Sequence, residues 1–223
     1  MTERLVPLFD ALQAERERTW DPAKLHRNVE QRRALVAAFD PATTIAAGDR
    51  IAPFSLEWAD GRVVTSAELA ATGAVALIFF RFAGCPACNI ALPYYDRTLA
   101  PVAASAGVRL VAVSPHLPET GLGEIAERHG LRYPVAADRG NALGRSLGIT
   151  FVPDDDTPIR EGDQGWIGAL TGTHTWELPQ PTVVVIDRYH VVRFADVSPD
   201  WLRRTEGDGV IAALEDLRFA TAA

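Results

Sequence analysis

Residues 74–93, AVALIFFRFAGCPACNIALP, decide the fold of this chain. A short apolar run that ends in a turn of small residues predicts a strand buried on both faces of a mostly parallel sheet. Pro86 suits the first turn of a helix, because its missing N–H would be unpaired there in any case. The predicted geometry is strand, turn, helix. Cys85 then lies at the helix N-terminus, where free N–H groups and the helix dipole favour a thiolate.

The composition of the 223-residue chain suits one globular domain with additions, or at most two domains. The formal net charge of −7 argues against nucleic acid or an anionic membrane as the main partner. No apolar run approaches the roughly 18 residues needed to cross a bilayer, and the N-terminus lacks the apolar core of a signal peptide. A cytoplasmic location is therefore expected.

Both cysteines of the chain, Cys85 and Cys88, lie in one C-x-x-C motif. In a cytoplasmic chain two cysteines are not a disulfide framework, so a redox or metal role is favoured. The motif supplies only two of the four ligands of a structural zinc site. Thiol chemistry needs neither a metal nor an organic cofactor, and none is expected.

Residues 1–45 form a predicted N-terminal helical extension. Apolar residues recur at helical spacing from Leu5 to Leu12, and Asp21-Pro22 is typical of the cap and first turn of a second helix. Two interpretations stay open at this point. The helices either cover the redox core as a hairpin or form the contact of a homodimer.

Residues 46–223 alternate between strand and helix patterns, which predicts an α/β domain with a central sheet flanked by helices. A long helix is expected from Pro86 to about Ser105, kinked at Pro93. Two further buried strands, a hairpin turn and a last helix are predicted at 108–114, 182–187, 188–190 and 209–219.

Residues 151–177 break this alternation and are expected to be a loop insertion. The segment begins with an acidic, turn-rich stretch and continues with glycine, threonine and the aromatic residues Trp166 and Trp176. A loop of this length inside a compact domain is often functional. It either folds over the sheet edge and buries its two tryptophans, or contributes to the substrate side of the site.

The chain resembles the thioredoxin fold in three features. These are the C-x-x-C motif, Pro93 eight residues after Cys85, and Pro181-Thr182 before an apolar strand. In that fold the C-x-x-C opens a helix that such a proline kinks, and a cis-proline at the start of a later strand faces the cysteines. The resemblance implies that Pro181 is this cis-proline, and that Thr182 and Pro86 support the site.

A wider series resembles the peroxiredoxin-like branch of the alkyl hydroperoxide reductase/thiol-specific antioxidant (AhpC/TSA) superfamily. Its opening G-D-x-A-P-x-F-x-L is similar to residues 48–56, and F-Y-R-G-G-W-C-P-Y-C-N is similar to 79–89. The ordered series covers roughly residues 46–217 and continues with V-A-I-S, L-P-V-P-A-T-F-V-I-D and D-Y-x-x-R-x-E at 111–114, 178–187 and 200–206.

This resemblance implies a redox enzyme in which the Cys85 thiolate reduces a hydroperoxide. Cys88 is then the resolving thiol that closes an intramolecular disulfide. The implied partners are a hydroperoxide or disulfide substrate and a thiol electron donor, such as a thioredoxin-like protein or a low-molecular-weight thiol.

The chain departs from peroxiredoxins proper at the peroxide-binding positions. Phe82 occupies the place of the usual threonine or serine, Gly84 that of a tryptophan, and Pro181-Thr182 that of an arginine. Two alternatives therefore stand beside the peroxidase. One is a thioredoxin-like thiol–disulfide oxidoreductase. The other is a non-catalytic redox sensor or interaction module.

Four further side chains are candidates for the site. Arg81 lies four residues before Cys85 and either lowers the pKa of that thiol or faces outward. His116 follows the second buried strand and is expected to be a solvated loop histidine rather than a proton donor. His174 lies in the insertion, and Asn89 either hydrogen-bonds near the cysteines or faces solvent.

Overall fold

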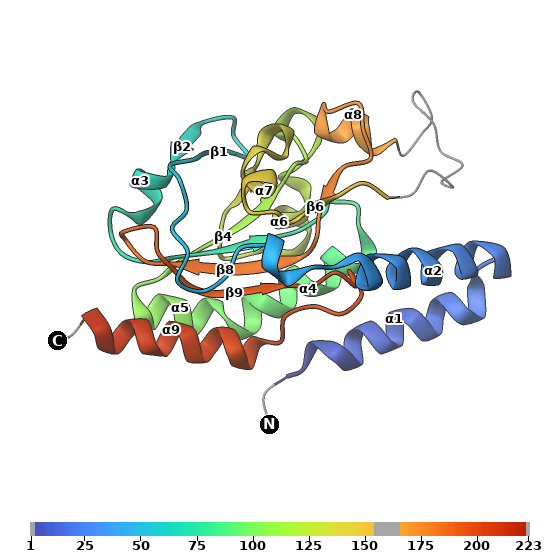
Figure 1. Cartoon of the computed structure of the whole chain (residues 1–223), viewed down its shortest axis with the longest axis horizontal. Coiled ribbons are helices and arrows are strands. Elements are labelled where there is room, and N and C mark those ends of the chain that lie inside the picture. Colours follow the sequence, from blue (N-terminus) through green and yellow to red (C-terminus); the bar gives the residue numbers. More distant parts are fainter. Residues whose placement is uncertain (1–2, 154–165, 222–223) are drawn as a thin grey trace.

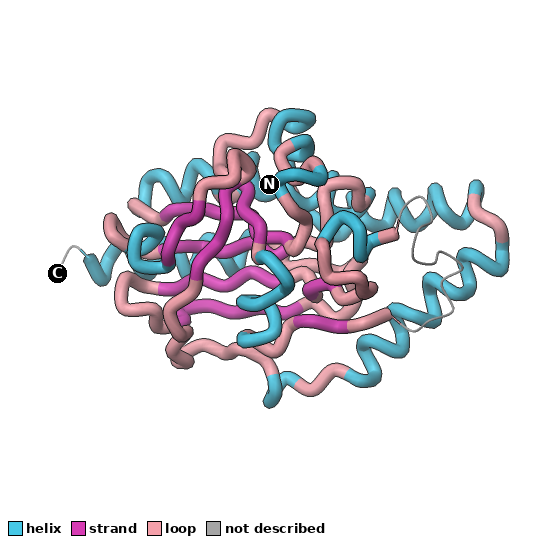
Figure 2. Tube along the Cα trace, turned by 90° about the horizontal axis from the view of Figure 1, so that it is seen from above, coloured by secondary structure: helices cyan, strands magenta, loops and turns pink. Residues whose placement is uncertain are grey.

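The computed structural model describes residues 3–153 and 166–221. Its centre is a seven-stranded mixed sheet with the strand order β2-β1-β5-β4-β3-β8-β9 (Figure 1 and Figure 2). The predicted α/β fold is confirmed. The strands of this sheet are β1 (Ser55–Trp58), β2 (Val63–Thr65), β3 (Val75–Phe79), β4 (Arg109–Ser114), β5 (Val135–Ala137), β8 (Thr182–Ile186) and β9 (Val192–Val197).

Helices pack on both faces of this sheet. In Figure 1, α4, α5 and α9 lie below it, while α3 and α7 lie on the other side. The helices are α1 (Leu5–Thr19), α2 (Pro22–Ala38), α3 (Ser66–Ala70), α4 (Pro86–Thr98), α5 (Ala100–Ala106), α6 (Glu124–His129), α7 (Ala142–Ser146), α8 (Ile167–Thr171) and α9 (Gly207–Thr221). Short 3₁₀ turns occur at Pro41–Thr43, Pro118–Thr120 and Arg139–Asn141.

Strand β3 lies inside the sheet between β4 and β8, and all five of its residues are buried. It runs parallel to β4 and antiparallel to β8. Because successive side chains point to opposite faces, Ala76 and Ile78 enter the core beneath α4, whereas Leu77 and Phe79 enter the core beneath α3 and α7. Both faces of β3 are therefore buried, as its sequence predicted, which is why every position in the strand is apolar.

The long helix predicted from Pro86 to Ser105 is two helices in the structure. α4 contains Pro93 and ends at Thr98, and α5 begins at Ala100 with Pro101 in its first turn. Pro101 has no N–H to donate to the carbonyl four residues earlier, so the helix restarts at that point. The prediction of one continuous helix was therefore wrong, whereas the kink at Pro93 stays a prediction.

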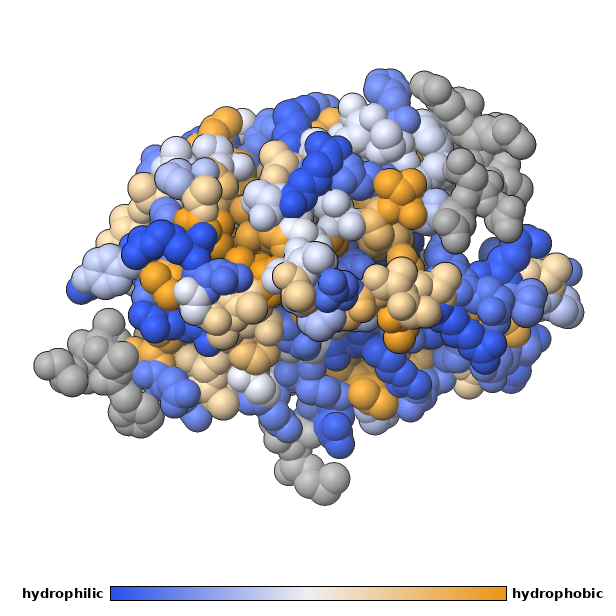
Figure 3. All heavy atoms as spheres, in the orientation of Figure 1, coloured by the Kyte–Doolittle hydropathy of each residue, from blue (hydrophilic) through white to orange (hydrophobic). Residues whose placement is uncertain are grey.

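At one end of the sheet α1 packs against α4, and α2 packs against α1 (Figure 1). Leu5 and Phe9 of α1 are fully buried and belong to the same core cluster as the cysteines. Asp21 caps α2 by accepting the N–H groups of Ala23 and Lys24 at 3.0 Å. α2 has no buried residue, and the surface over it is mostly hydrophilic (Figure 3). A dimer contact through these helices stays a prediction.

The predicted insertion is joined at its base by a small sheet. β6 (Thr150–Phe151) pairs antiparallel with β7 (Leu178–Pro179). Trp166 is buried and meets the ring of Trp176 edge to face at 4.9 Å between centroids. The acidic part of the insertion, residues 154–165, lies outside the described residues. Among the residues that the structure describes, no helix is long and apolar enough to cross a membrane.

Candidate active site

Cys85 lies where the chain leaves the sheet and enters α4. It is the N-cap residue of that helix, with Pro86 as the first helical residue, as predicted. The Cys85 carbonyl accepts the N–H groups of Cys88 and Asn89, each at 3.0 Å. Both cysteines are free thiols. Only 2% of Cys85 is exposed, and Cys88 is completely buried.

His116 holds the loop that precedes Cys85. It is buried, and its Nδ1 accepts the N–H of Ala83 at 3.2 Å. Its Nε2 therefore carries the proton and donates to the carbonyl of Thr120 at 3.0 Å. Burial lowers the pKa of His116, which keeps the ring neutral. The expected solvated loop histidine is wrong: the ring is inside and fixes the backbone.

Asn89 ties the same loop to the first turn of α4. Its Nδ2 donates to the carbonyls of Ala83 at 2.8 Å and Cys85 at 2.9 Å. Its Oδ1 accepts from Arg128 at 2.9 Å and is 2.7 Å from the Nε2 of His129. Of the two alternatives for Asn89, the hydrogen-bonding one is correct. The backbone around Cys85 is thus held by side chains from α4, α6 and the β4–α6 connection.

Arg204 is a functional candidate that the sequence did not single out. It is buried, its Nη2 lies 3.3 Å from the Cys88 sulfur, and its Nε donates to the Trp201 carbonyl at 3.1 Å. The only sequence signal was its place as the arginine of the closing D-Y-x-x-R-x-E pattern. A buried guanidinium needs an anionic partner, and Cys88 is positioned to be that partner as a thiolate.

The two sulfurs form a hydrogen-bonded pair in which Cys88 is the more acidic member. Burial opposes ionisation of Cys88, but the hydrogen bond from Cys85 and the charge of Arg204 outweigh it and hold the pKa of Cys88 well below its ordinary value. The hydrogen bond to Cys88 and burial raise the pKa of Cys85 well above its ordinary value, against the opposing charges of Arg81 and Arg204. Because two interacting thiols titrate as a pair, the expectation that the helix N-terminus makes Cys85 the thiolate stays a prediction.

Comparison with known proteins agrees with this geometry. Residues 47–195 match the model of the AhpC/TSA family. The chain belongs to the AhpC/TSA family. It is 27% identical over 146 residues to the thiol-disulfide oxidoreductase ResA of Geobacillus thermodenitrificans, covering 62% of this chain and 77% of that protein. The ResA protein of Halalkalibacterium halodurans is 28% identical over 109 residues, covering 48% of this chain and 59% of that protein.

Solved structures show the same thioredoxin-like fold. The crystal structure of peroxidoxin BcpB from Mycobacterium tuberculosis superposes with a TM-score of 0.59 at 22% identity, over 77% of this chain and 97% of that chain. A peroxiredoxin-like protein from Aquifex aeolicus gives 0.58 at 18% identity, over 78% and 88%. With a free C-x-x-C pair at the start of α4, this AhpC/TSA protein is a thiol-based oxidoreductase.

Arg81 of the AhpC/TSA domain faces the site rather than the solvent. Its guanidinium lies 4.7 Å from the ring centroid of Trp201 and 5.7 Å from that of Phe82. Its charge lowers the pKa of Cys85, although the hydrogen bond to Cys88 and burial outweigh it. Of the two alternatives for Arg81, proximity to the thiol is the one that the structure supports.

Pro181 and Thr182 lie beside the end of β3, but not as the resemblance implied. Every peptide bond between described residues is trans, so Pro181 is not a cis-proline. The chain enters β8 extended, with the Pro181 carbonyl accepting the N–H of Ser198 at 2.9 Å, and a trans bond accommodates this path. The hydroxyl of Thr182, which pairs with Phe79 across the sheet, donates to the Gln180 carbonyl at 2.9 Å.

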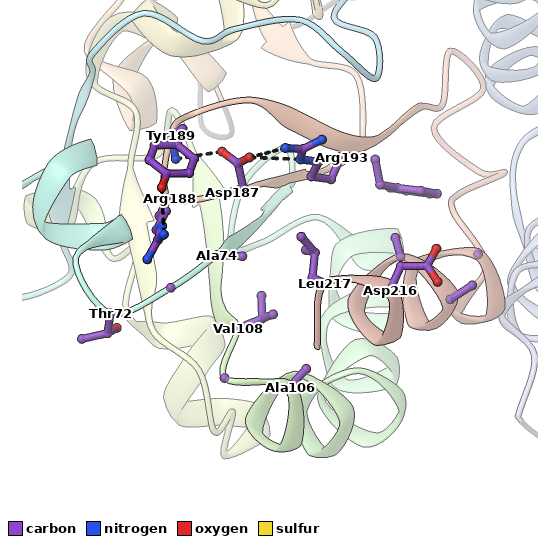
Figure 4. A pocket seen from close by; sticks show the side chains of 16 residues that line it. Thr72, Ala74, Ala106, Val108, Asp187, Arg188, Tyr189, Arg193, Asp216 and Leu217 are labelled. Carbon is purple, nitrogen blue, oxygen red and sulfur yellow. Dashed lines mark hydrogen bonds and ion pairs between the residues drawn. The ribbon is translucent and has the colours of Figure 1, made fainter. Parts of the chain in front are cut away.

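A cavity of about 900 Å³ lies at the opposite end of β3 (Figure 4). It is bordered by Ala74 just before β3, by Asp187 just after β8, and by residues of α9 such as Leu217. The cysteines do not border it. His174 lies in the insertion with a left-handed backbone, φ 54°, and does not line this cavity. In the described ranges, 3–153 and 166–221, no cluster of three His, Cys, Asp or Glu side chains is arranged to hold a metal ion.

Proposed function

We propose that this protein reduces hydroperoxides, with Cys85 as the nucleophile and Cys88 as the resolving thiol. The observation that carries the proposal is the free C-x-x-C pair at the start of α4, with the guanidinium of Arg204 3.3 Å from the Cys88 sulfur. Cys85 is the member at the helix N-cap, and it is the more exposed of the two. Free N–H groups there stabilise the negative charge once it moves to this sulfur.

The reaction proceeds in two steps. Cys88 first takes the proton of Cys85, and the resulting Cys85 thiolate attacks the terminal oxygen of the hydroperoxide. The O–O bond breaks, Cys85 becomes a sulfenic acid, and the alkoxide leaves and takes a proton from water. The Cys88 sulfur then attacks the sulfenic acid, its proton leaves with the hydroxyl as water, and a disulfide closes. Two electrons from a thiol donor later reduce that disulfide.

A thiol–disulfide oxidoreductase is the second candidate. Phe82 has no hydroxyl to hold a peroxide, and the ResA proteins that the chain resembles are named for disulfide chemistry. In that case the Cys85 thiolate attacks a substrate disulfide, and Cys88 releases the mixed disulfide as a thiol. A redox sensor without turnover is a third alternative. For either enzyme the expected setting is the cytoplasm, with a thioredoxin-like protein or a low-molecular-weight thiol as donor.

Stopped-flow fluorescence of the reduced protein tests these alternatives. Mixing with hydrogen peroxide or cumene hydroperoxide should oxidise the pair much faster than a free thiol, and Cys85→Ser should abolish the signal. Cys88→Ser should stop at a sulfenic acid that dimedone labels. Oxidation no faster than that of a free thiol would refute the peroxidase. Reduction of insulin disulfides that survives Cys85→Ser would refute the second candidate, and turnover with any thiol donor would refute the sensor.

A further inference from the structure

Three guanidinium groups surround one indole ring beside the cysteines. The guanidinium carbons of Arg16, Arg32 and Arg81 lie 5.4, 5.6 and 4.7 Å from the ring centroid of Trp201. They come from α1, α2 and the loop that follows β3, three segments that are far apart in the sequence. We call these three residues the arginine cluster.

Two members of the arginine cluster have no carboxylate partner among the residues that the structure describes. Arg32 pairs with Asp200 at 3.2 Å. The side chains of Arg16 and Arg81, in contrast, make no hydrogen bond or ion pair with any residue in 3–153 or 166–221. Arg16 is only 4% exposed, and its Nε and Nη1 are buried without a partner, as are the Nε of Arg81 and the Nε1 of Trp201. A buried guanidinium without an anion is costly, so this arrangement favours binding of one.

Arg16 is buried, although glutamates flank it in the sequence and α1 has a solvent-exposed side. It is flanked by Glu15 and Glu17 in the sequence, but Glu15 pairs with Arg18 and Glu17 accepts from Gln13. Neighbouring helix positions face different directions, so neither glutamate reaches Arg16. Arg18, two residues further on, keeps 71% of its side chain exposed. On α1, Arg18 is therefore exposed to solvent, whereas Arg16 is buried.

The ring that the arginine cluster surrounds belongs to the same buried core cluster as the cysteines, and Arg204 donates to the Trp201 carbonyl at 3.1 Å and lies 3.3 Å from the Cys88 sulfur. The charges of Arg16 and Cys85 interact, and so do those of Arg81 and Cys85. Burial lowers the pKa of Arg16, and so do the like charges of Arg32 and Arg81, against the raising effect of Cys85. An anion placed between these groups would relieve that repulsion.

We propose that Arg16 and Arg81 bind the carboxylate of the substrate, which makes the preferred substrate a hydroperoxide that carries a carboxylate. A planar guanidinium offers paired N–H donors that match the two oxygens of a carboxylate. The Nε1–H of Trp201 is a third free donor at the same place. This assignment rests on the proposed peroxidase for the reacting group, but its central claim, an anion site beside Cys85, is independent of it.

Alkylation of Cys85 tests the anion site without any peroxide. Iodoacetate and iodoacetamide have similar size and leaving group, but only iodoacetate carries a carboxylate. The ratio of their rate constants cancels any change in the thiolate fraction. We expect Arg16→Gln to lower this iodoacetate-to-iodoacetamide ratio about tenfold, the loss expected for one charge-assisted hydrogen bond. Arg18→Gln, on the exposed side of the same helix, should leave the ratio unchanged.

A second measurement uses the unmodified protein and does not depend on the folding of a variant. Benzoate should slow alkylation of Cys85 by iodoacetate, whereas benzamide should not. Equal ratios in the wild type, Arg16→Gln and Arg18→Gln, or equal effects of benzoate and benzamide, would overturn the proposal.

The substrate class is then tested with a fatty-acid hydroperoxide and its methyl ester. The acid should have the higher kcat/KM, and Arg16→Gln should remove about tenfold of that preference. Equal kcat/KM values for acid and ester would reject the substrate class. If neither compound is reduced, the proposed peroxidase fails, while the alkylation ratio still decides the anion site.

Discussion

The two ends of β3 carry their charged groups in opposite ways. At the cavity end, Asp187 accepts from Arg193 at 2.7 Å and from the N–H groups of Tyr189 and Val191, so its charge is balanced locally (Figure 4). At the cysteine end, Arg16 and Arg81 make no ion pair within the described part of the chain, and Arg204 lies against the sulfur of Cys88. The cavity shows only that there is room at its end of β3. At the cysteine end, buried arginine charge that the described residues do not pair favours thiolate chemistry and anion binding.

The largest effect is expected when the positive charge of Arg204 beside the two sulfurs is removed. Arg204→Met should raise the pKa of the reduced pair, because burial would then oppose ionisation of Cys88 without a cation to offset it. Each unit of that shift reduces the thiolate fraction about tenfold, so at neutral pH alkylation should slow by about tenfold or more. The pH dependence of iodoacetamide labelling measures it, with Arg203→Met as the exposed neighbouring control. An unchanged pH profile would show that Arg204 does not hold the thiolate.

The second prediction concerns His116, which holds the loop before Cys85, and its effect on stability. Its pKa is lower in the folded chain, so below about pH 6.5 the unfolded chain binds the proton more readily and stability falls. Above that pH both states are neutral and the contribution is constant. His116→Gln should cost about 1–2 kcal/mol at neutral pH through its two hydrogen bonds, and should flatten the loss of stability on acidification. Urea unfolding from pH 7.5 to pH 5 measures this.

The control for His116 is the exposed His26 on α2. His26→Gln should leave both the stability and its pH dependence as in the wild type. If the stability of His116→Gln falls on acidification as much as that of the wild type, the burial of the His116 ring does not lower its pKa.

The smallest effect is expected at the cavity end. Arg193→Gln breaks the pair with Asp187, in which the arginine side chain is 51% exposed, so the loss of stability should stay within about 1 kcal/mol. Peroxide reduction should be unchanged, because this end of β3 is remote from the sulfurs. Thermal unfolding and stopped-flow oxidation of the same preparation measure the two. A large loss of activity would mean that the two ends are coupled, and the comparison would fail.

Sequence reasoning was most accurate where the physics is local. The buried strand, the helix opened by Pro86, the hairpin at 188–190 and the cap at Asp21 follow from periodicity and from backbone groups only a few residues apart. It was less accurate for the length of the helix that begins at Pro86. Both Pro93 and Pro101 could interrupt this stretch, and only the structure shows that the helix divides next to Pro101.

The sequence by itself determined the sheet, the family and the position of the C-x-x-C pair at a helix start. Only the tertiary structure decided the electrostatics of that pair. Arg204 meets Cys88 across 116 residues of chain, and Arg16 lies in a run of alternating charges that is typical of a solvated helix face. Burial, and with it the strength of a charge, depends on which distant segments pack together. No local pattern in a chain carries that information.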